Sequence, residues 1–153
     1  MLVQDIMAKN PAVCLRDTPL VEAARLMVEF DCGALPVVKD KETFHPVGVI
    51  TDRDIVCRVV AENQNPLERT VEAAMTTSAV TVGGEQSVDV CSQLMQDHQI
   101  RRVAVVDNNG ACIGMVSQAD LALNRVGDPA TTVREISEPD DETDVPLGGD
   151  YSG

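Results

Sequence analysis

A short motif occurs twice in this chain, and its residue types could bind a nucleoside phosphate. Each copy has a glycine, two apolar residues, a threonine or serine and, three positions after that hydroxyl, an aspartate. A carboxylate can accept two hydrogen bonds from the cis-diol of a ribose, and a hydroxyl group one turn earlier can reach a phosphate. The copies span residues 48–54 and 114–120, with Thr51 and Ser117 as the hydroxyl residues and Asp54 and Asp120 as the acids.

The same spacing is also that of a capping box at the start of a helix. The hydroxyl of Thr51 or Ser117 would accept a hydrogen bond from a backbone N–H of the first turn, and the acid would lie at the positive end of the helix dipole. A helix N-terminus that follows a strand also presents unpaired N–H groups, which suit an anion such as phosphate. The two interpretations use one geometry, so the spacing alone supports both.

The motif belongs to a longer repeat that covers most of the chain. Matching residues lie 68 positions apart through most of the repeat and 66 apart at its end, so the first copy has two extra residues. We assign these to the polar loop 39–46. Two copies do not suggest an open solenoid, which needs about three or more repeats for stability. They indicate two similar half-domains packed on each other, with any ligand sites duplicated.

Hydrophobic periodicity predicts the order strand, helix, strand, strand, helix in each copy. In the first copy we expect Thr18 as the N-cap of the first helix, Pro19 at the first helical position and Gly33 as the C-terminal stop. Pro36 favours an edge position or a strand start. Ser87 is the expected N-cap in the second copy. The expected strands are 12–15, 35–38, 47–50, 79–82, 103–106 and 113–116, and the last helix of each copy begins at Asp52 or Gln118.

Charge and composition argue against several classes of protein. The net charge is −13; residues 1–125 carry 11 basic against 17 acidic side chains, and residues 126–153 carry one against eight. Direct binding to nucleic acid is not expected, because no basic cluster could neutralise several phosphates at once. Few large apolar residues remain beyond 126, so we predict a disordered acidic tail there. Without a signal-peptide pattern or a run of 18 apolar residues, we expect a cytoplasmic protein that spans no membrane.

Side chains that could support catalysis or redox chemistry are few. The two histidines, at 45 and 98, form no evident triad, and no metal-ligand cluster stands out. The five cysteines are odd in number and have no CxxC spacing, so we expect mainly buried, reduced thiols. An enzyme is the least favoured function. A thiol-based redox sensor that uses Cys32 or Cys57, and a non-catalytic interaction module without a ligand, stay open as alternatives to a ligand sensor.

The repeated motif is similar to that of the cystathionine β-synthase (CBS) domain. The resemblance extends to the leaders that end at Met7 and Met75 and to the segment His-Gln-Ile-Arg-Arg-Val at 98–103, and it covers about residues 1–125. Two such domains in tandem form a CBS pair, or Bateman module; residues 33–38 and 51–56 resemble stand-alone pairs linked to hypoxia or stress. The implied fold is α+β, two βαββα repeats packed about a pseudo-twofold axis, with 1–62 as the first repeat, 63–69 as a linker, 70–125 as the second repeat and 126–153 as the tail.

The resemblance implies a sensor of adenosine-containing ligands with no obligatory cofactor and no metal. AMP, ADP, ATP or S-adenosylmethionine would bind in clefts between the repeats and signal by conformational change to an unknown effector protein. Two pairs would form a homodimer, a flat disc of four repeats. The implied ligand residues are Asp54 and Asp120 for the riboses, Thr51 and Ser117 near the phosphates, Ala12, Val13, Ala79 and Val80 for the adenines, and Arg53, His98, Arg101 and Arg102 for phosphate.

The two implied clefts would differ in charge. The second copy has His98, Arg101 and Arg102 in one short segment, whereas the matching residues 30–34 of the first copy carry no cation. The basic side chains would therefore favour one cleft, and the other could be empty or degenerate. The sequence does not determine which cleft the two arginines serve, which nucleotide binds, or which partner reads the signal.

Overall fold

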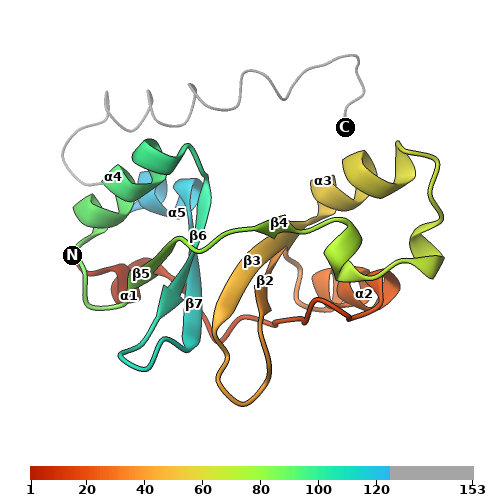
Figure 1. Ribbon diagram of the computed structural model, residues 1–153. Coiled ribbons are helices and arrows are strands. Elements are labelled where there is room, and N and C mark those ends of the chain that lie inside the picture. The colour runs from red at the N-terminus through yellow and green to blue at the C-terminus, as the bar shows by residue number, and fades with distance from the viewer. Residues whose placement is uncertain (125–153) are drawn as a thin grey trace.

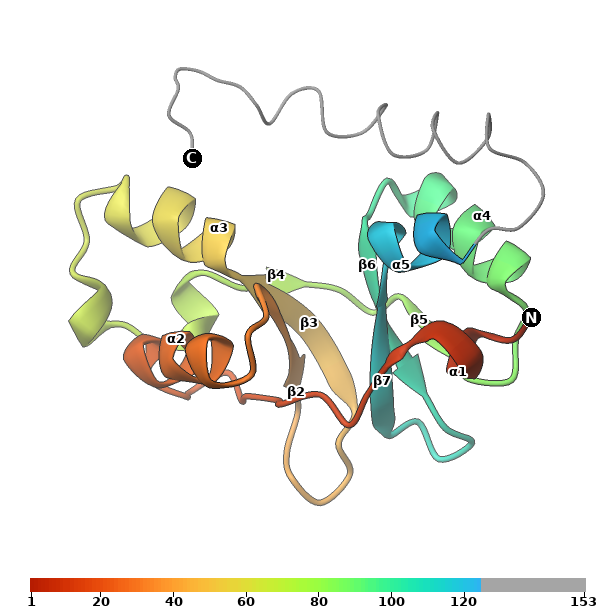
Figure 2. The same ribbon diagram turned by 180° about the vertical axis from the view of Figure 1, so that it is seen from behind.

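Two antiparallel β-hairpins lie side by side at the centre of the molecule (Figures 1 and 2). The computed structural model describes residues 1–124, and the tail predicted from residue 126 lies outside the described residues. The hairpin strands are rich in valine, which suits a half-buried pleated surface. All four strands agree with the prediction to within one residue at each end. β2 (Ala34–Val38) pairs with β3 (Pro46–Thr51), and β6 (Arg102–Val106) pairs with β7 (Cys112–Ser117).

The loops that close the two hairpins differ in length as predicted. The loop between β2 and β3 has seven residues, 39–45, and the loop between β6 and β7 has five, 107–111. The two extra residues of the first repeat therefore lie in the polar loop. The hairpins also touch at this end, because Nε2 of His45 lies 3.0 Å from the carbonyl oxygen of Asn109.

The first long helix of each repeat buries one face and leaves the other in water. An apolar residue recurs every three or four positions, so one stripe of the helix packs on the core. The α+β class predicted from the sequence is confirmed by these helices and the two sheets. The buried residues are Leu20, Ala23 and Met27 in α2 (Leu20–Glu29) and Cys91, Ser92 and Met95 in α4 (Val88–His98).

The two long helices start in different ways. Ser87 caps α4 as predicted, because its hydroxyl accepts a hydrogen bond from the N–H of Val90 (3.3 Å). The predicted cap of α2 is wrong, since the N-cap position is Pro19 and not Thr18. The Thr18 hydroxyl is turned back along the chain and accepts the N–H of Leu15 (2.9 Å). A local hydrogen bond to the preceding turn thus replaces the cap.

The predicted stop of α2 at Gly33 is also wrong. The left-handed residue that ends the helix is Asp31 (φ 52°), and Gln99 (φ 54°) ends α4 at the matching position. Behind Asp31 the N–H of Cys32 donates to the carbonyl oxygen of Met27 (3.0 Å), a bond typical of a helix C-terminus. The chain has therefore turned before it reaches the glycine.

The last helix of each repeat begins where the sequence predicts. α3 (Asp52–Ile55) continues as a π-helix, η1 (Val56–Val60), whereas α5 (Gln118–Leu123) is α-helical. The repeat pattern does not predict the wider helical turn of η1 in the first repeat. Within residues 1–124 no helix is long and apolar enough to cross a membrane.

The first strand forms in the second repeat and is reduced to a single bridge in the first. β5 (Thr81–Gly83) runs parallel to β6, but at the equivalent place only Cys14 pairs with Val37, so the predicted strand 12–15 is wrong. Pro36 gives the physical reason, because it has no N–H to continue the parallel ladder toward residue 12. β2 is accordingly an edge strand of its sheet, as the proline predicts.

The leader of each repeat pairs with the sheet of the other repeat. The first leader holds α1 (Val3–Ile6) and β1 (Ala8–Lys9), and β1 is antiparallel to β7. The second leader pairs with β3 through its own short strand, β4 (Thr76–Thr77). The sheets therefore have the orders β1-β7-β6-β5 and β2-β3-β4, each with strands from both repeats. The rest of the second leader contains the 3₁₀ helix η3 (Val71–Ala73), and the 3₁₀ helix η2 (Pro66–Glu68) precedes it in the linker.

Each leader contributes buried residues to the hydrophobic core of the other repeat. Val71, Ala74 and Met75 are buried with the first repeat, and Val3 is buried with the second. A third, smaller cluster lies where the two hairpins meet and contains Val38 from one repeat and Ala104 and Cys112 from the other. Separating the repeats would expose all three clusters.

Gly48 and Gly114, the first residues of the repeated motif, lie where the leaders cross the sheets. A Cβ added at Gly48 would overlap the carbonyl oxygen of Thr76 in β4. A Cβ at Gly114 would overlap the side chain of Met7 and lie 3.0 Å from the carbonyl oxygen of Ala8. Glycine is required at both positions because another backbone approaches closely.

Gly48→Ala should lower the free energy of unfolding by about 1–3 kcal/mol, because the backbone of β4 must shift to admit the methyl group. Gly83→Ala is the matched control, since its Cβ would meet only the Gln86 side chain, at 3.5 Å or more. Urea unfolding of both variants measures the difference. A Gly48→Ala variant as stable as Gly83→Ala would contradict the close approach of the leader.

Candidate ligand-binding clefts

Both repeated motifs form capping boxes. The N–H of Thr51 donates to Oδ2 of Asp54 (3.0 Å), and the N–H of Asp54 donates to Oγ1 of Thr51 (3.0 Å). The same two hydrogen bonds join Ser117 and Asp120, at 2.9 and 3.1 Å. The capping interpretation is therefore confirmed. The box holds each carboxylate at a helix start and uses only one of its two oxygens, Oδ2.

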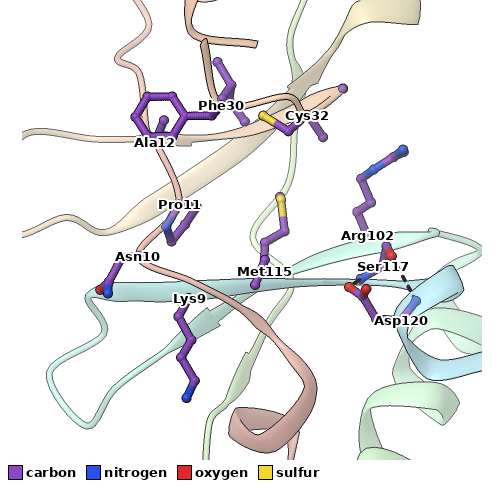
Figure 3. A pocket seen from close by; sticks show the side chains of 14 residues that line it. Lys9, Asn10, Pro11, Ala12, Phe30, Cys32, Arg102, Met115, Ser117 and Asp120 are labelled. Atoms are coloured by element: carbon purple, nitrogen blue, oxygen red, sulfur yellow. Dashed lines mark hydrogen bonds between the residues drawn. The ribbon is translucent and has the colours of Figure 1, made fainter. Parts of the chain in front are cut away.

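Each capping box also opens onto a cleft between the repeats. The Asp120 cleft has a volume of about 330 Å³, and the Asp54 cleft a volume of about 210 Å³. Each cleft combines the motif of one repeat with strand and helix-end residues of the other. The Asp120 cleft is lined by residues 8–12, 30, 32–35, 102, 115, 117 and 120 (Figure 3), and the Asp54 cleft by residues 46, 48, 49, 51, 53, 54, 76, 78, 80 and 100–104.

The structure places the predicted arginines in these clefts. Arg53 and Arg101 line the Asp54 cleft, and Arg102 lines both clefts. The sequence left open which cleft Arg101 and Arg102 serve, and the lining of the two clefts now answers that question. Arg101 lies opposite the motif of the first repeat, and Arg102 lies between the two sites.

Two of the residues implied for adenine lie in the clefts, and two do not. Ala12 lines the Asp120 cleft and Val80 the Asp54 cleft. Val13 instead packs against the small cluster between the hairpins, because neighbouring residues of an extended segment point to opposite sides. Ala79 is exposed and lines neither cleft, for the same reason.

His98 also lines neither cleft. It is the last residue of α4 and is exposed, and the left-handed Gln99 turns the chain before the arginines begin. Its position fits a solvated residue at a helix end, where a basic side chain meets the negative end of the helix dipole. Its matching residue in the first repeat, Phe30, lines the Asp120 cleft.

Several cleft residues were missed at the sequence level. Phe30, Cys32 and Met115 line the Asp120 cleft, and Ile100 and Ser78 line the Asp54 cleft. The repeat offset could have shown that Cys32 and Ile100 have equivalent places, because they occupy matching positions. It could not show which helix end faces which motif, since that depends on how the repeats pack.

Arg58 lies next to Asp54 and is not among the residues that line the Asp54 cleft. Its Nη1 donates to the carbonyl oxygen of Met75 (2.8 Å), and its Nε lies 4.0 Å from Oδ1 of Asp54. The guanidinium therefore links the helical end of the first repeat to the leader of the second. Such an exposed pair contributes little stability by itself. The capping box, and not this contact, holds the Asp54 carboxylate in place.

Comparison with known proteins identifies the family. The family model of the CBS domain matches residues 3–61 and 71–127. The chain belongs to the CBS domain family. The two matches coincide with the two sequence repeats, so the chain carries a CBS pair, and the resemblance noted from the sequence is confirmed.

Its relatives include other small CBS proteins. The chain is 36% identical over 124 residues to the CBS domain-containing protein YhcV of Bacillus subtilis (81% of this chain, 85% of that protein). It is 34% identical over 119 residues to hypoxic response protein 1 of Mycobacterium tuberculosis (78% and 81%). It spans about half the length of a Methanopyrus kandleri relative (38% identical over 101 residues, 66% and 50%) and 24% of a homoserine O-acetyltransferase of Methanocorpusculum labreanum. CBS pairs are typically regulatory, and here the enzyme match covers only a small part of the enzyme.

Solved structures of CBS pairs share the fold. The hypoxic response protein I structure has a TM-score of 0.70 at 30% identity (82% of this chain, 99% of that chain) and holds two coordinated zinc ions. The CBS pair of protein MJ0100, solved with 5′-methylthioadenosine and S-adenosyl-L-methionine, has a TM-score of 0.69 at 30% identity (80% and 94%). CBSX2 with AMP has a TM-score of 0.64 at 25% identity (80% and 94%). In the described part of the present chain no group of three or more His, Cys, Asp or Glu could hold a metal ion.

The five cysteines fall into two groups. Burial raises the pKa of the Cys14 thiol to about 12 and that of Cys91 to about 11, and it also raises the pKa of Cys112. These three thiols behave as small core hydrophobes, as expected. Cys32 and Cys57 are exposed, so the expectation of mainly buried thiols holds for three of the five.

At pH 8 iodoacetamide should alkylate Cys32 and Cys57 of the native protein and leave Cys14, Cys91 and Cys112 unmodified. The attacking species is the thiolate, and burial keeps the second group protonated as well as covered. Mass spectrometry of peptides measures the labelling, and a sample unfolded in guanidinium should label at all five positions. Fast native labelling of Cys14 would contradict its burial.

Proposed function

We propose that this CBS pair is a regulatory module that binds an adenosine-containing ligand in the clefts beside Asp54 and Asp120. The observation that carries the proposal is the duplicated geometry, because each cleft sets a hydroxyl and a carboxylate of one repeat opposite apolar residues of the other. Solved CBS pairs with AMP, 5′-methylthioadenosine or S-adenosylmethionine support it. No catalytic step is proposed.

Each side chain has a specific role in this proposal. Asp54 and Asp120 accept hydrogen bonds from ribose hydroxyls, for which a carboxylate keeps several acceptor sites beyond the one used in the capping box. Thr51 and Ser117 accept the box N–H and can donate their own hydroxyl proton to a ligand oxygen. The arginines supply charge-assisted hydrogen bonds for phosphate.

The proposed signal is a shift in the arrangement of the two repeats. A ligand that touches both sides of a cleft binds one arrangement more tightly and raises its population. The size of the shift is limited by the difference in affinity between the two arrangements. An effector protein in the cytoplasm would read the change, and its identity is not specified by the clefts.

A thermal-shift titration with AMP, ADP, ATP, NAD and S-adenosylmethionine tests the proposal. A ligand at a hundred times its Kd should stabilise the fold by about 2.7 kcal/mol, which raises Tm by roughly 5–10 °C. Asp54→Ala or Asp120→Ala should abolish the shift of a ligand held in the corresponding cleft. The absence of any shift in a folded protein would contradict the proposal and favour the ligand-free interaction module.

The control must separate ligand binding from capping. Each Asp→Ala variant also loses a capping hydrogen bond, which costs about 1 kcal/mol by itself. Asp5→Ala is matched to them, because Asp5 accepts the N–H of Leu2 in the same way (2.9 Å) and lines neither cleft. It should lower Tm without changing the ligand-induced shift.

We also propose a homodimer through the helices. Val56 and Val60 of η1 are 56% and 50% exposed, and Leu123 of α5 is 82% exposed. α3 and α5 lie on the same side of the molecule (Figures 1 and 2), so a partner on that side could cover these exposed apolar residues. A cyanobacterial CBS-CP12 protein with this fold is hexameric (TM-score 0.72 at 26% identity, 84% of this chain and 73% of that chain).

Val56→Asp combined with Val60→Asp should convert the dimer to a monomer, because two carboxylates would be buried without partners at the contact. Size-exclusion chromatography with light scattering measures the mass. Leu67→Asp is the control, since Leu67 is 71% exposed on η2, outside the helical face. A dimer that persists in the double variant would rule out this surface, and a monomeric wild type would rule out the dimer.

A further inference from the structure

The two clefts differ at the three positions that carry arginine in the Asp54 cleft. Arg53, Arg101 and Arg102 line the Asp54 cleft. The residues that the repeat offset places at these positions on the Asp120 side are Ala119, Gly33 and Ala34. Each arginine of the Asp54 cleft is therefore matched in the sequence by a small, uncharged residue, and of the three arginines only Arg102 also lines the Asp120 cleft. Arg53 and Arg101 line only the Asp54 cleft, and the Asp120 cleft is the larger one, about 330 Å³ against about 210 Å³.

Softer, less polar groups occupy the larger cleft. Phe30, Cys32 and Met115 all line it, and Figure 3 shows Met115 rising from β7 toward the side that carries Phe30 and Cys32. The matching residues of Cys32 and Met115 in the Asp54 cleft are Ile100 and Val49. A thioether, a thiol and an aromatic ring favour contact with apolar and sulfur-containing groups.

Two cations, Lys9 and Arg102, line the Asp120 cleft, and they offer a phosphate less than the three arginines of the Asp54 cleft do. Lys9 follows Ala8, which pairs with Met115 across β1 and β7, so strand alternation sends the Lys9 side chain to the opposite face of the sheet. Figure 3 shows Lys9 extending away from Met115. Arg102 lines both clefts, whereas Arg53 and Arg101 add two further guanidinium groups at the Asp54 cleft only.

We propose that the two clefts bind different classes of adenosine ligand. The Asp54 cleft takes the nucleotide, because three guanidinium groups can neutralise and hydrogen-bond a 5′-phosphate. The Asp120 cleft takes an adenosine derivative whose 5′ substituent carries no phosphate and is apolar or sulfur-containing. This inference rests on the proposed function, since it divides between the two clefts the ligands that the module would sense.

Isothermal titration calorimetry with AMP and with 5′-methylthioadenosine tests the division. AMP binding should be lost in Asp54→Ala and kept in Asp120→Ala, and 5′-methylthioadenosine should show the reverse. Arg101→Ala should weaken AMP by about tenfold or more and leave the Kd of 5′-methylthioadenosine unchanged, because one charge-assisted contact is removed from one cleft only. Asp5→Ala again controls for the lost capping bond.

A gain-of-binding variant makes the test independent of damage to the fold. Ala34→Arg combined with Ala119→Arg places two of the missing arginines beside Asp120, and an Asp54→Ala background removes the other site. AMP affinity should then rise by about tenfold or more over Asp54→Ala alone. The charge-matched control is Ala61→Arg with Gln64→Arg, two exposed positions that line neither cleft.

The outcomes separate this inference from the proposed function. If both ligands lose binding in the same Asp→Ala variant, or if the added arginines leave AMP affinity unchanged, the division of ligands is overturned while the sensor stands. If neither ligand binds the folded wild type and no other adenosine ligand shifts its Tm, both proposals fall. Opposite losses in the two variants, with AMP gained in the arginine variant, establish the division.

Discussion

The exchange of leaders between the repeats is the constraint on which the rest of the structure depends. β1 belongs to the first repeat but completes the sheet of the second, and β4 does the opposite. Each leader brings buried residues with it, so each half of the core contains chain from both repeats. The close approach at Gly48 and Gly114 fixes how the halves meet. The two clefts lie in that contact, and their shape is therefore a property of the pair and not of either repeat.

The capping boxes connect this packing of the two repeats to the binding of a ligand. A box satisfies N–H groups that a helix start would leave unpaired, so it is stabilising whether or not a ligand binds. It also holds Asp54 and Asp120 in one orientation beside the clefts. A side chain fixed in this way loses little further entropy when a ligand arrives, which favours affinity. Capping and binding are thus not competing explanations of the motif, because the first prepares the geometry that the second requires.

Local patterns predicted local structure, and packing decided the rest. The hairpin strands and the starts of α3, α4 and α5 were predictable, because alternation and capping residues act over a few positions. The strand around Cys14 was not, since Pro36, on a different strand, removes the N–H that would extend its ladder. The residues that face each other across the clefts could not be predicted from local patterns either. The repeat offset matches Arg101 with Gly33, but only the exchange of strands between repeats shows that Arg101 lies across from Asp54 and Gly33 across from Asp120.

The exchanged leaders also set an order of events during protein synthesis. Lys9 pairs with Gly114, so the partner of this residue of the first leader is made 105 residues later. Contacts so distant in sequence slow folding, because the intervening chain must be ordered first. Val3 and Met7 therefore stay exposed to water, or to a chaperone, until the second hairpin has formed. A CBS pair built in this way completes its fold as one unit, once the second hairpin has been made, and a nascent chain stopped after the first repeat would have no finished domain.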